Sequence, residues 1–118
     1  MIASLRHIYA DGGSVQLKAM SKPAHLSTMA DIRKDIDRID EQLIKLLAER
    51  QRCVERAIEV KKREGIPARV PERIDRVIDN VRVLARAHHV DPAMVETMWT
   101  EMLEWFIAHE ERSLSTQK

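Results

Sequence analysis

Apolar residues recur every three or four positions from residue 28 to residue 64, which is the spacing of an amphipathic α-helix. Thr28 to Asp31 has capping-box spacing and predicts where the helix begins, while Gly65 and Pro67 predict where it ends. The pattern therefore predicts one helix of about 35 residues, about 50 Å long. Its apolar positions are Ile32, Ile36, Ile39, Leu43, Leu46, Leu47, Cys53, Val54, Ala57, Ile58 and Val60.

Two further amphipathic helices follow. One begins at Pro71, a residue suited to the first turn, and ends around His88 and His89. Asp91 and Pro92 form an N-cap followed by an N1 proline, so the third helix begins there. The sequence therefore predicts an all-α fold of three helices, with one long N-terminal helix.

The first helix is too long for a compact domain of about 90 residues, whose radius of gyration is about 12 Å. One chain cannot cover the whole apolar stripe of such a helix. The sequence therefore predicts that a second copy covers it in a homodimer.

The first 28 residues carry turn and linker signals and no helical periodicity. We expect residues 1–28 to form a flexible N-terminal extension, with a short hairpin from Ile8 to Leu17 as the alternative. Met29 could also be the natural start of the chain. The expected helical domain covers residues 29–114, followed by a polar tail at 115–118.

Composition excludes several classes of protein. Among 118 residues, aromatic residues make up 3% and there are three glycines, which argues against β-barrels and glycine-loop nucleotide folds. Twenty basic and 19 acidic residues leave a net charge of +1, too little for a nucleic-acid binder. One cysteine, Cys53, excludes an internal disulfide. No apolar run reaches about 18 residues and no signal-peptide core is visible, so we expect no membrane span and a cytoplasmic location.

Three charged residues lie on apolar stripes. Arg50 and Lys61 are close to three helical turns apart on one face, about 16 Å along the axis. Glu110 continues the stripe of Leu103 and Phe106 in the third helix. Buried charges usually have partners, so these residues could simply pair with one another or reach water. The alternative is a cationic pocket for a small anion.

Neither a metal site nor a covalent nucleophile is indicated. His88 and His89 are adjacent, which does not give the i, i+4 spacing of a helical zinc site. No Ser/His/Asp or Cys/His arrangement is visible. An enzyme with this sequence would work without metal, cofactor or covalent intermediate.

Residues from about Ala30 to Glu111 resemble the all-helical chorismate mutases. The resemblance rests on DIRKDIDRIDEQLIKLLAER (residues 31–50), on Lys61, on PERIDRV (71–77) and on AHHVD (87–91). EWFIAHE (104–110) is closer to the isochorismate-pyruvate lyase branch of the same fold. The resemblance implies an intertwined homodimer whose long first helix spans both active sites.

The same resemblance implies roles for five polar residues. Arg33 of the partner chain and Arg50 would each bind a substrate carboxylate. Lys61 would donate to the ether oxygen and a carboxylate, and Glu110 would face the same oxygen. Arg73 matches an arginine at the start of the second helix.

The chain departs from the family pattern in two ways. Many chorismate mutases carry a glutamate that holds the substrate hydroxyl where this chain has Ile74, and Val70 replaces a nearby residue that is acidic in some members. Glu110 stands where glutamine is common. Phe106 completes the expected substrate-binding set.

The resemblance implies conversion of chorismate, a small dicarboxylate, to prephenate within aromatic amino acid biosynthesis. This pericyclic rearrangement needs no nucleophile, metal or cofactor, and cations can hold the reactive conformer while donors stabilise the ether oxygen. An isochorismate-pyruvate lyase that forms salicylate, a mutase for an amino analogue of chorismate, and a non-catalytic regulatory dimer that binds a metabolite remain alternatives.

Overall fold

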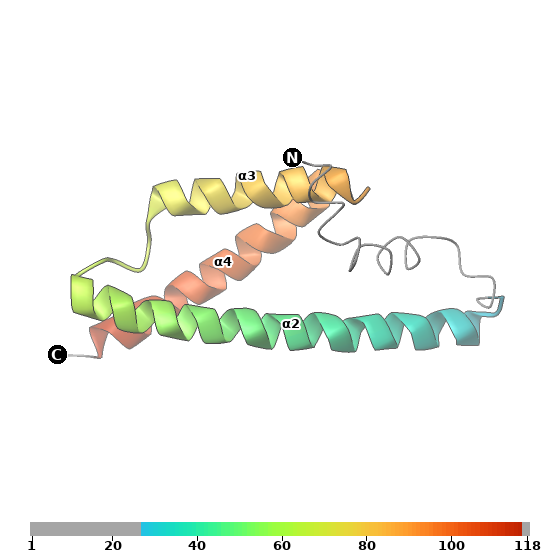
Figure 1. The fold of residues 1–118 in the computed structure, drawn as a ribbon, viewed down its shortest axis with the longest axis horizontal. Coiled ribbons are helices and arrows are strands. Elements are labelled where there is room, and N and C mark those ends of the chain that lie inside the picture. Colours follow the sequence, from blue (N-terminus) through green and yellow to red (C-terminus); the bar gives the residue numbers. More distant parts are fainter. Residues whose placement is uncertain (1–26, 117–118) are drawn as a thin grey trace, which may run out of the picture. The chain divides into compact units, whose positions relative to one another are not determined.

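The computed structural model describes residues 27–116, and all regular structure in this range is helical. The helices are α2 (Met29–Glu64), α3 (Pro71–Ala87) and α4 (Pro92–Ser115), shown in Figure 1. The predicted all-α class with three helices is confirmed. The expected N-terminal extension lies outside the described residues, except for Ser27 and Thr28.

Helix α2 has 36 residues, close to the predicted length. At its start, the backbone N–H of Asp31 donates to Thr28 Oγ1 at 3.1 Å, so the predicted cap is formed. At its end, Gly65 adopts a positive φ of 69°, and the Ile66 N–H reaches back to the Lys61 carbonyl at 3.0 Å. A left-handed residue closed by such a bond is a common helix terminus, which explains the glycine.

The chain divides into two units, and their boundary in the sequence falls within α2, between Leu47 and Ala48. In the described part of the first unit, the apolar stripe of α2 is solvent-exposed in the single chain. Its large side chains keep between 40% and 60% of their surface accessible. These residues are Ile36, Ile39, Leu43, Leu46 and Leu47.

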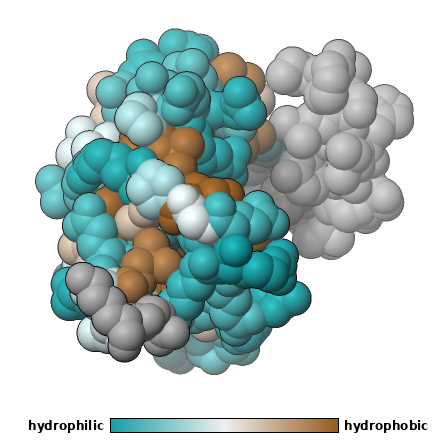
Figure 2. All heavy atoms as spheres, turned by 90° about the vertical axis from the view of Figure 1, so that its left-hand side faces the viewer, coloured by the Kyte–Doolittle hydropathy of each residue, from teal (hydrophilic) through white to brown (hydrophobic). Residues whose placement is uncertain are grey.

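The second unit contains the end of α2 together with α3 and α4. The backbones of α3 and α4 lie close together, and Arg82 of α3 pairs with Glu96 of α4. Small and branched apolar residues form the buried core, although Figure 2 shows other apolar side chains at the surface. The buried apolar residues are Ile58, Ala68, Ala85 and Ile107.

The two adjacent histidines, His88 and His89, lie in the turn between α3 and α4. His89 has a positive φ of 62°, and the Val90 N–H bonds the Ala85 carbonyl at 2.8 Å, closing α3. Asp91 then caps α4 by accepting the Ala93 N–H at 2.8 Å, as its position before Pro92 predicts. The histidines therefore lie in a connection rather than on a helix face.

None of the described helices combines the length and apolar character needed to cross a membrane. The cytoplasmic location remains a prediction.

Candidate active site

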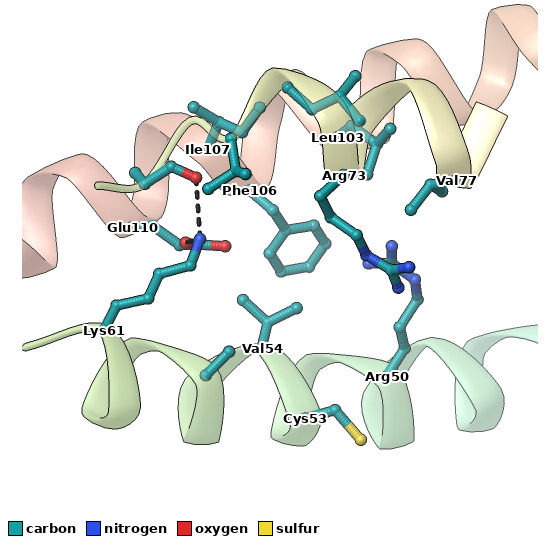
Figure 3. Close-up of a pocket in the computed structure, with 14 residues that line it drawn as sticks. Arg50, Cys53, Val54, Lys61, Arg73, Val77, Leu103, Phe106, Ile107 and Glu110 are labelled. Atoms are coloured by element: carbon teal, nitrogen blue, oxygen red, sulfur yellow. Dashed lines mark hydrogen bonds and ion pairs between the residues drawn. The ribbon is translucent and has the colours of Figure 1, made fainter. Parts of the chain in front are cut away.

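A cavity of about 320 Å³ lies within the second unit, in the size range of small-molecule sites. Figure 3 shows its main side chains, which come from α2, α3 and α4. Helical spacing of three or four residues brings the α2 and α4 side chains to a common face. The lining residues are Arg50, Cys53, Val54, Ala57, Lys61, Ala68, Val70, Arg73, Ile74, Val77, Leu103, Phe106, Ile107 and Glu110.

Lys61 and Glu110 form an ion pair in this cavity. Lys61 Nζ lies 2.7 Å from Glu110 Oε1, and 8% of the surface of Glu110 is accessible. The same ammonium donates to the Ala68 carbonyl at 2.9 Å. Because an ammonium has three N–H donors, one donor is left for a ligand.

The guanidinium of Arg50 has a buried donor that a ligand can bind. Its Nη1 atom is removed from water and has no hydrogen-bond partner among the described residues. The guanidinium carbon lies 5.8 Å from the centroid of the Phe106 ring, within cation–π range. A buried donor without a partner is costly, so a bound carboxylate would satisfy it.

Arg73 approaches the cavity from the first turn of α3, and in the described chain it is not paired with a carboxylate. In Figure 3, the side chains of Arg50 and Arg73 are directed toward the same end of the cavity, while Lys61 and Glu110 occupy the other end. The excess positive charge therefore lies at the Arg50 and Arg73 end, while the Lys61 and Glu110 end is formally neutral and offers one N–H donor.

Apolar side chains line much of the rest of the cavity. Val70, Ile74 and Val77 bring no side-chain hydrogen-bond donor or acceptor to it. Three cationic side chains and one carboxylate line the cavity, so its formal charge is 3 − 1 = +2. This combination suits a small dianion with an apolar body.

The cavity brings together every site residue expected from the sequence except one. Arg33 is exposed near the start of α2 and does not line the cavity of this single chain. The structure also shows that Lys61 and Glu110 do pair, as the structural interpretation of these charges proposed.

Three features were not recognised in the sequence. Cys53, which the sequence analysis only placed on the apolar stripe of the first helix, is exposed and lines the cavity. The Ala68 carbonyl is a backbone group, so its role cannot be recognised from the residue type. His109 Nε2 lies 2.7 Å from Glu55 Oε2, a contact that joins α4 to α2 beside the cavity.

No group of three or more His, Cys, Asp or Glu side chains in residues 27–116 is arranged to hold a metal ion. The polar groups of the cavity are mainly cationic donors, which suit an anion rather than a metal.

Comparison with known proteins identifies the fold family. Residues 32–111 match the pattern of the family described as chorismate mutase type II. The chain belongs to the chorismate mutase type II family. The family predicted from the sequence is therefore confirmed.

Individual relatives differ in their activities. A chorismate mutase of Methanocaldococcus jannaschii is 41% identical over 66 residues, covering 56% of this chain and 67% of the relative. An isochorismate pyruvate lyase of Pseudomonas aeruginosa is 33% identical over 92 residues, covering 77% of this chain and 89% of the relative. A bifunctional chorismate mutase/prephenate dehydratase of Aquifex aeolicus is 36% identical over 56 residues, 48% of this chain and 16% of the relative.

Proposed function

We propose that this protein is a chorismate mutase that converts chorismate to prephenate in the cationic cavity of the second unit. The observation that carries the proposal is the cavity's charge of +2 around an apolar wall, with the buried Nη1 of Arg50 unpartnered among the described residues. Chorismate is a dicarboxylate with an apolar ring, so it matches this distribution. Membership of the chorismate mutase type II family supports the same activity.

Catalysis would combine positioning with electrostatic stabilisation. Arg50 binds one carboxylate through its guanidinium fork and, with cations at the same end, favours the folded conformer that reacts. As the C–O bond breaks, negative charge grows on the ether oxygen. The remaining N–H of Lys61 stabilises that charge, and Glu110 contributes a second donor when it is protonated.

The complete site requires a second copy of the chain. The exposed stripe of α2 offers a partner apolar surface. Arg33 lies three residues before Ile36 and shares its side of the helix, so a partner that covers the stripe also meets Arg33. In the intertwined homodimer, Arg33 of one copy supplies the second carboxylate clamp in the site of the other.

Isochorismate-pyruvate lyase activity is the second candidate. Two observations favour it: the lyase relative aligns with 77% of this chain, and Ile74 and Val70 give the cavity an apolar wall. An apolar wall provides no partner for a ring hydroxyl, so it does not select the hydroxyl position of chorismate over that of isochorismate.

Product analysis separates the candidates. The protein is incubated separately with chorismate, isochorismate and the amino analogue of chorismate. Prephenate from chorismate supports the mutase, whereas salicylate and pyruvate from isochorismate support the lyase. Binding without turnover of any of the three would assign the dimer a regulatory role.

A further inference from the structure

Arg69 and Glu104 form a bidentate ion pair beside the cavity. Nη1 and Nη2 of Arg69 donate to the two carboxylate oxygens of Glu104 at 3.0 and 2.7 Å. Arg69 belongs to the loop between α2 and α3, and Glu104 belongs to α4. Because a guanidinium–carboxylate fork fixes orientation as well as distance, it attaches the loop to α4 at a defined position.

Both neighbours of Arg69 in the chain serve the cavity. The Ala68 carbonyl accepts a hydrogen bond from the Lys61 ammonium. The Val70 carbonyl accepts the N–H groups of Arg73 and Ile74 at 3.0 and 3.1 Å, where α3 begins. Val70 gives α3 no side-chain cap, so the ion pair of Arg69 adds to the burial of Ala68 in holding this segment.

Lys61 depends on the Ala68 carbonyl for its orientation. A lysine ammonium rotates about a flexible stem, so the bond to Glu110 alone fixes one N–H and leaves the other two free to rotate. The second acceptor, Ala68, removes this freedom and directs the remaining N–H. Movement of the loop by a fraction of an ångström would loosen this arrangement.

We propose that Arg69 and Glu104 are positioning residues, whose ion pair holds the Ala68 carbonyl so that Lys61 keeps its remaining N–H directed into the cavity. The kinetic part of this inference rests on the proposed function. The orientation of Lys61 can be measured without turnover.

The kinetic test compares Glu104→Gln with Glu96→Gln. Glu96 is a matched control, because it also joins α4 to an arginine of another element, Arg82, and does not line the cavity. We expect kcat of Glu104→Gln to fall about tenfold while KM changes by less than about threefold, since a misplaced donor affects mainly the transition state. Glu96→Gln should stay within about twofold of the wild type in both constants.

Exchanging the two charged residues tests whether a restored ion pair recovers kcat. The double variant Arg69→Glu/Glu104→Arg restores the ion pair and should recover most of kcat, whereas Arg69→Glu alone should be impaired. An unchanged kcat in Glu104→Gln, equal losses in the two glutamine variants, or no rescue by the reversed pair would overturn the positioning role.

A second measurement remains decisive if none of the substrates is turned over. Lys61 is methylated reductively with formaldehyde, and its rate of modification is followed by mass spectrometry. We expect a rate about threefold higher in Glu104→Gln than in the wild type, because one acceptor no longer holds the ammonium, and no increase in Glu96→Gln. Equal rates in all three proteins would overturn the positioning role, whereas absence of turnover with the expected rates would reject only the proposed function.

Discussion

Lys61 and Glu110 meet at one end of the cavity with 2.7 Å between Nζ and Oε1, although they are 49 residues apart in the sequence. Their side chains are 18% and 10% exposed. Removal of one partner from such a pair leaves a poorly solvated charge, so each variant must be judged for folding as well as for activity.

Arg50 should be essential for catalytic activity, whereas the nearby Arg52 should not. Arg50→Ala removes a buried donor that has no partner among the described residues. We therefore expect kcat/KM for chorismate to fall by about 10²-fold, or about 3 kcal/mol of transition-state stabilisation. Arg52→Ala is the control, because Arg52 is exposed on the same helix and does not line the cavity. Steady-state kinetics of the two variants check this prediction, and equal activities would contradict a role of Arg50 in catalysis.

Glu110→Gln separates a catalytic role of this residue from a purely structural one. A carboxylate would repel the negative charge that develops on the ether oxygen, whereas an amide offers a donor to it. We expect kcat of Glu110→Gln with chorismate to equal or exceed that of the wild type, measured by steady-state kinetics. A kcat lower by about tenfold or more would mean that Glu110 acts only as the structural partner of Lys61.

Mixed dimers test the assignment of Arg33 to the partner's site. Arg33→Ala and Arg50→Ala homodimers should each be nearly inactive. A heterodimer of the two has one site with both lesions and one with neither, so about half of the wild-type activity per dimer should return. Exchange of subunits is verified by mass spectrometry, and exchanged dimers that remain inactive would contradict a shared site.

The ion pair of Arg69 and Glu104 should weaken in acid. Hydrogen bonds from Arg69 hold the pKa of Glu104 below its ordinary value. Such a carboxyl contributes stability above its unfolded pKa, about 4.3, and loses it as pH falls through the folded pKa. The Tm of the wild type should therefore exceed that of Glu104→Gln at about pH 6 and converge with it near about pH 3. A constant difference across this range would indicate that the carboxylate charge is not involved.

The sequence predicted the helices well because their signals are local. Apolar spacing located α2, and Thr28, Asp91 and the prolines at positions 71 and 92 marked helix starts that the structure contains. The charges on apolar stripes likewise indicated residues that line one cavity. Each of these signals depends on neighbours within a few positions along the chain.

The remaining features depend on tertiary contacts. Arg69 and Glu104 are 35 residues apart and exposed, so nothing local distinguishes them from other surface charges. The Ala68 carbonyl is present in any residue, and only the loop geometry places it beside Lys61. Cys53 occupies an apolar stripe position that faces the cavity instead of the core.

The most direct test is to follow chorismate by proton NMR in the presence of wild-type protein, Lys61→Ala and Lys62→Ala. Lys62 is the control, because it is exposed and does not line the active-site cavity. The double variant Lys61→Ala/Glu110→Gln is included because it leaves no unpaired carboxylate and separates folding from catalysis.

We expect the wild type and Lys62→Ala to form prephenate, while both variants that lack Lys61 lose about 10²-fold or more in kcat/KM with their far-UV helicity retained. Failure of the wild type to form prephenate, or ordinary activity without Lys61, would contradict the proposed mutase site.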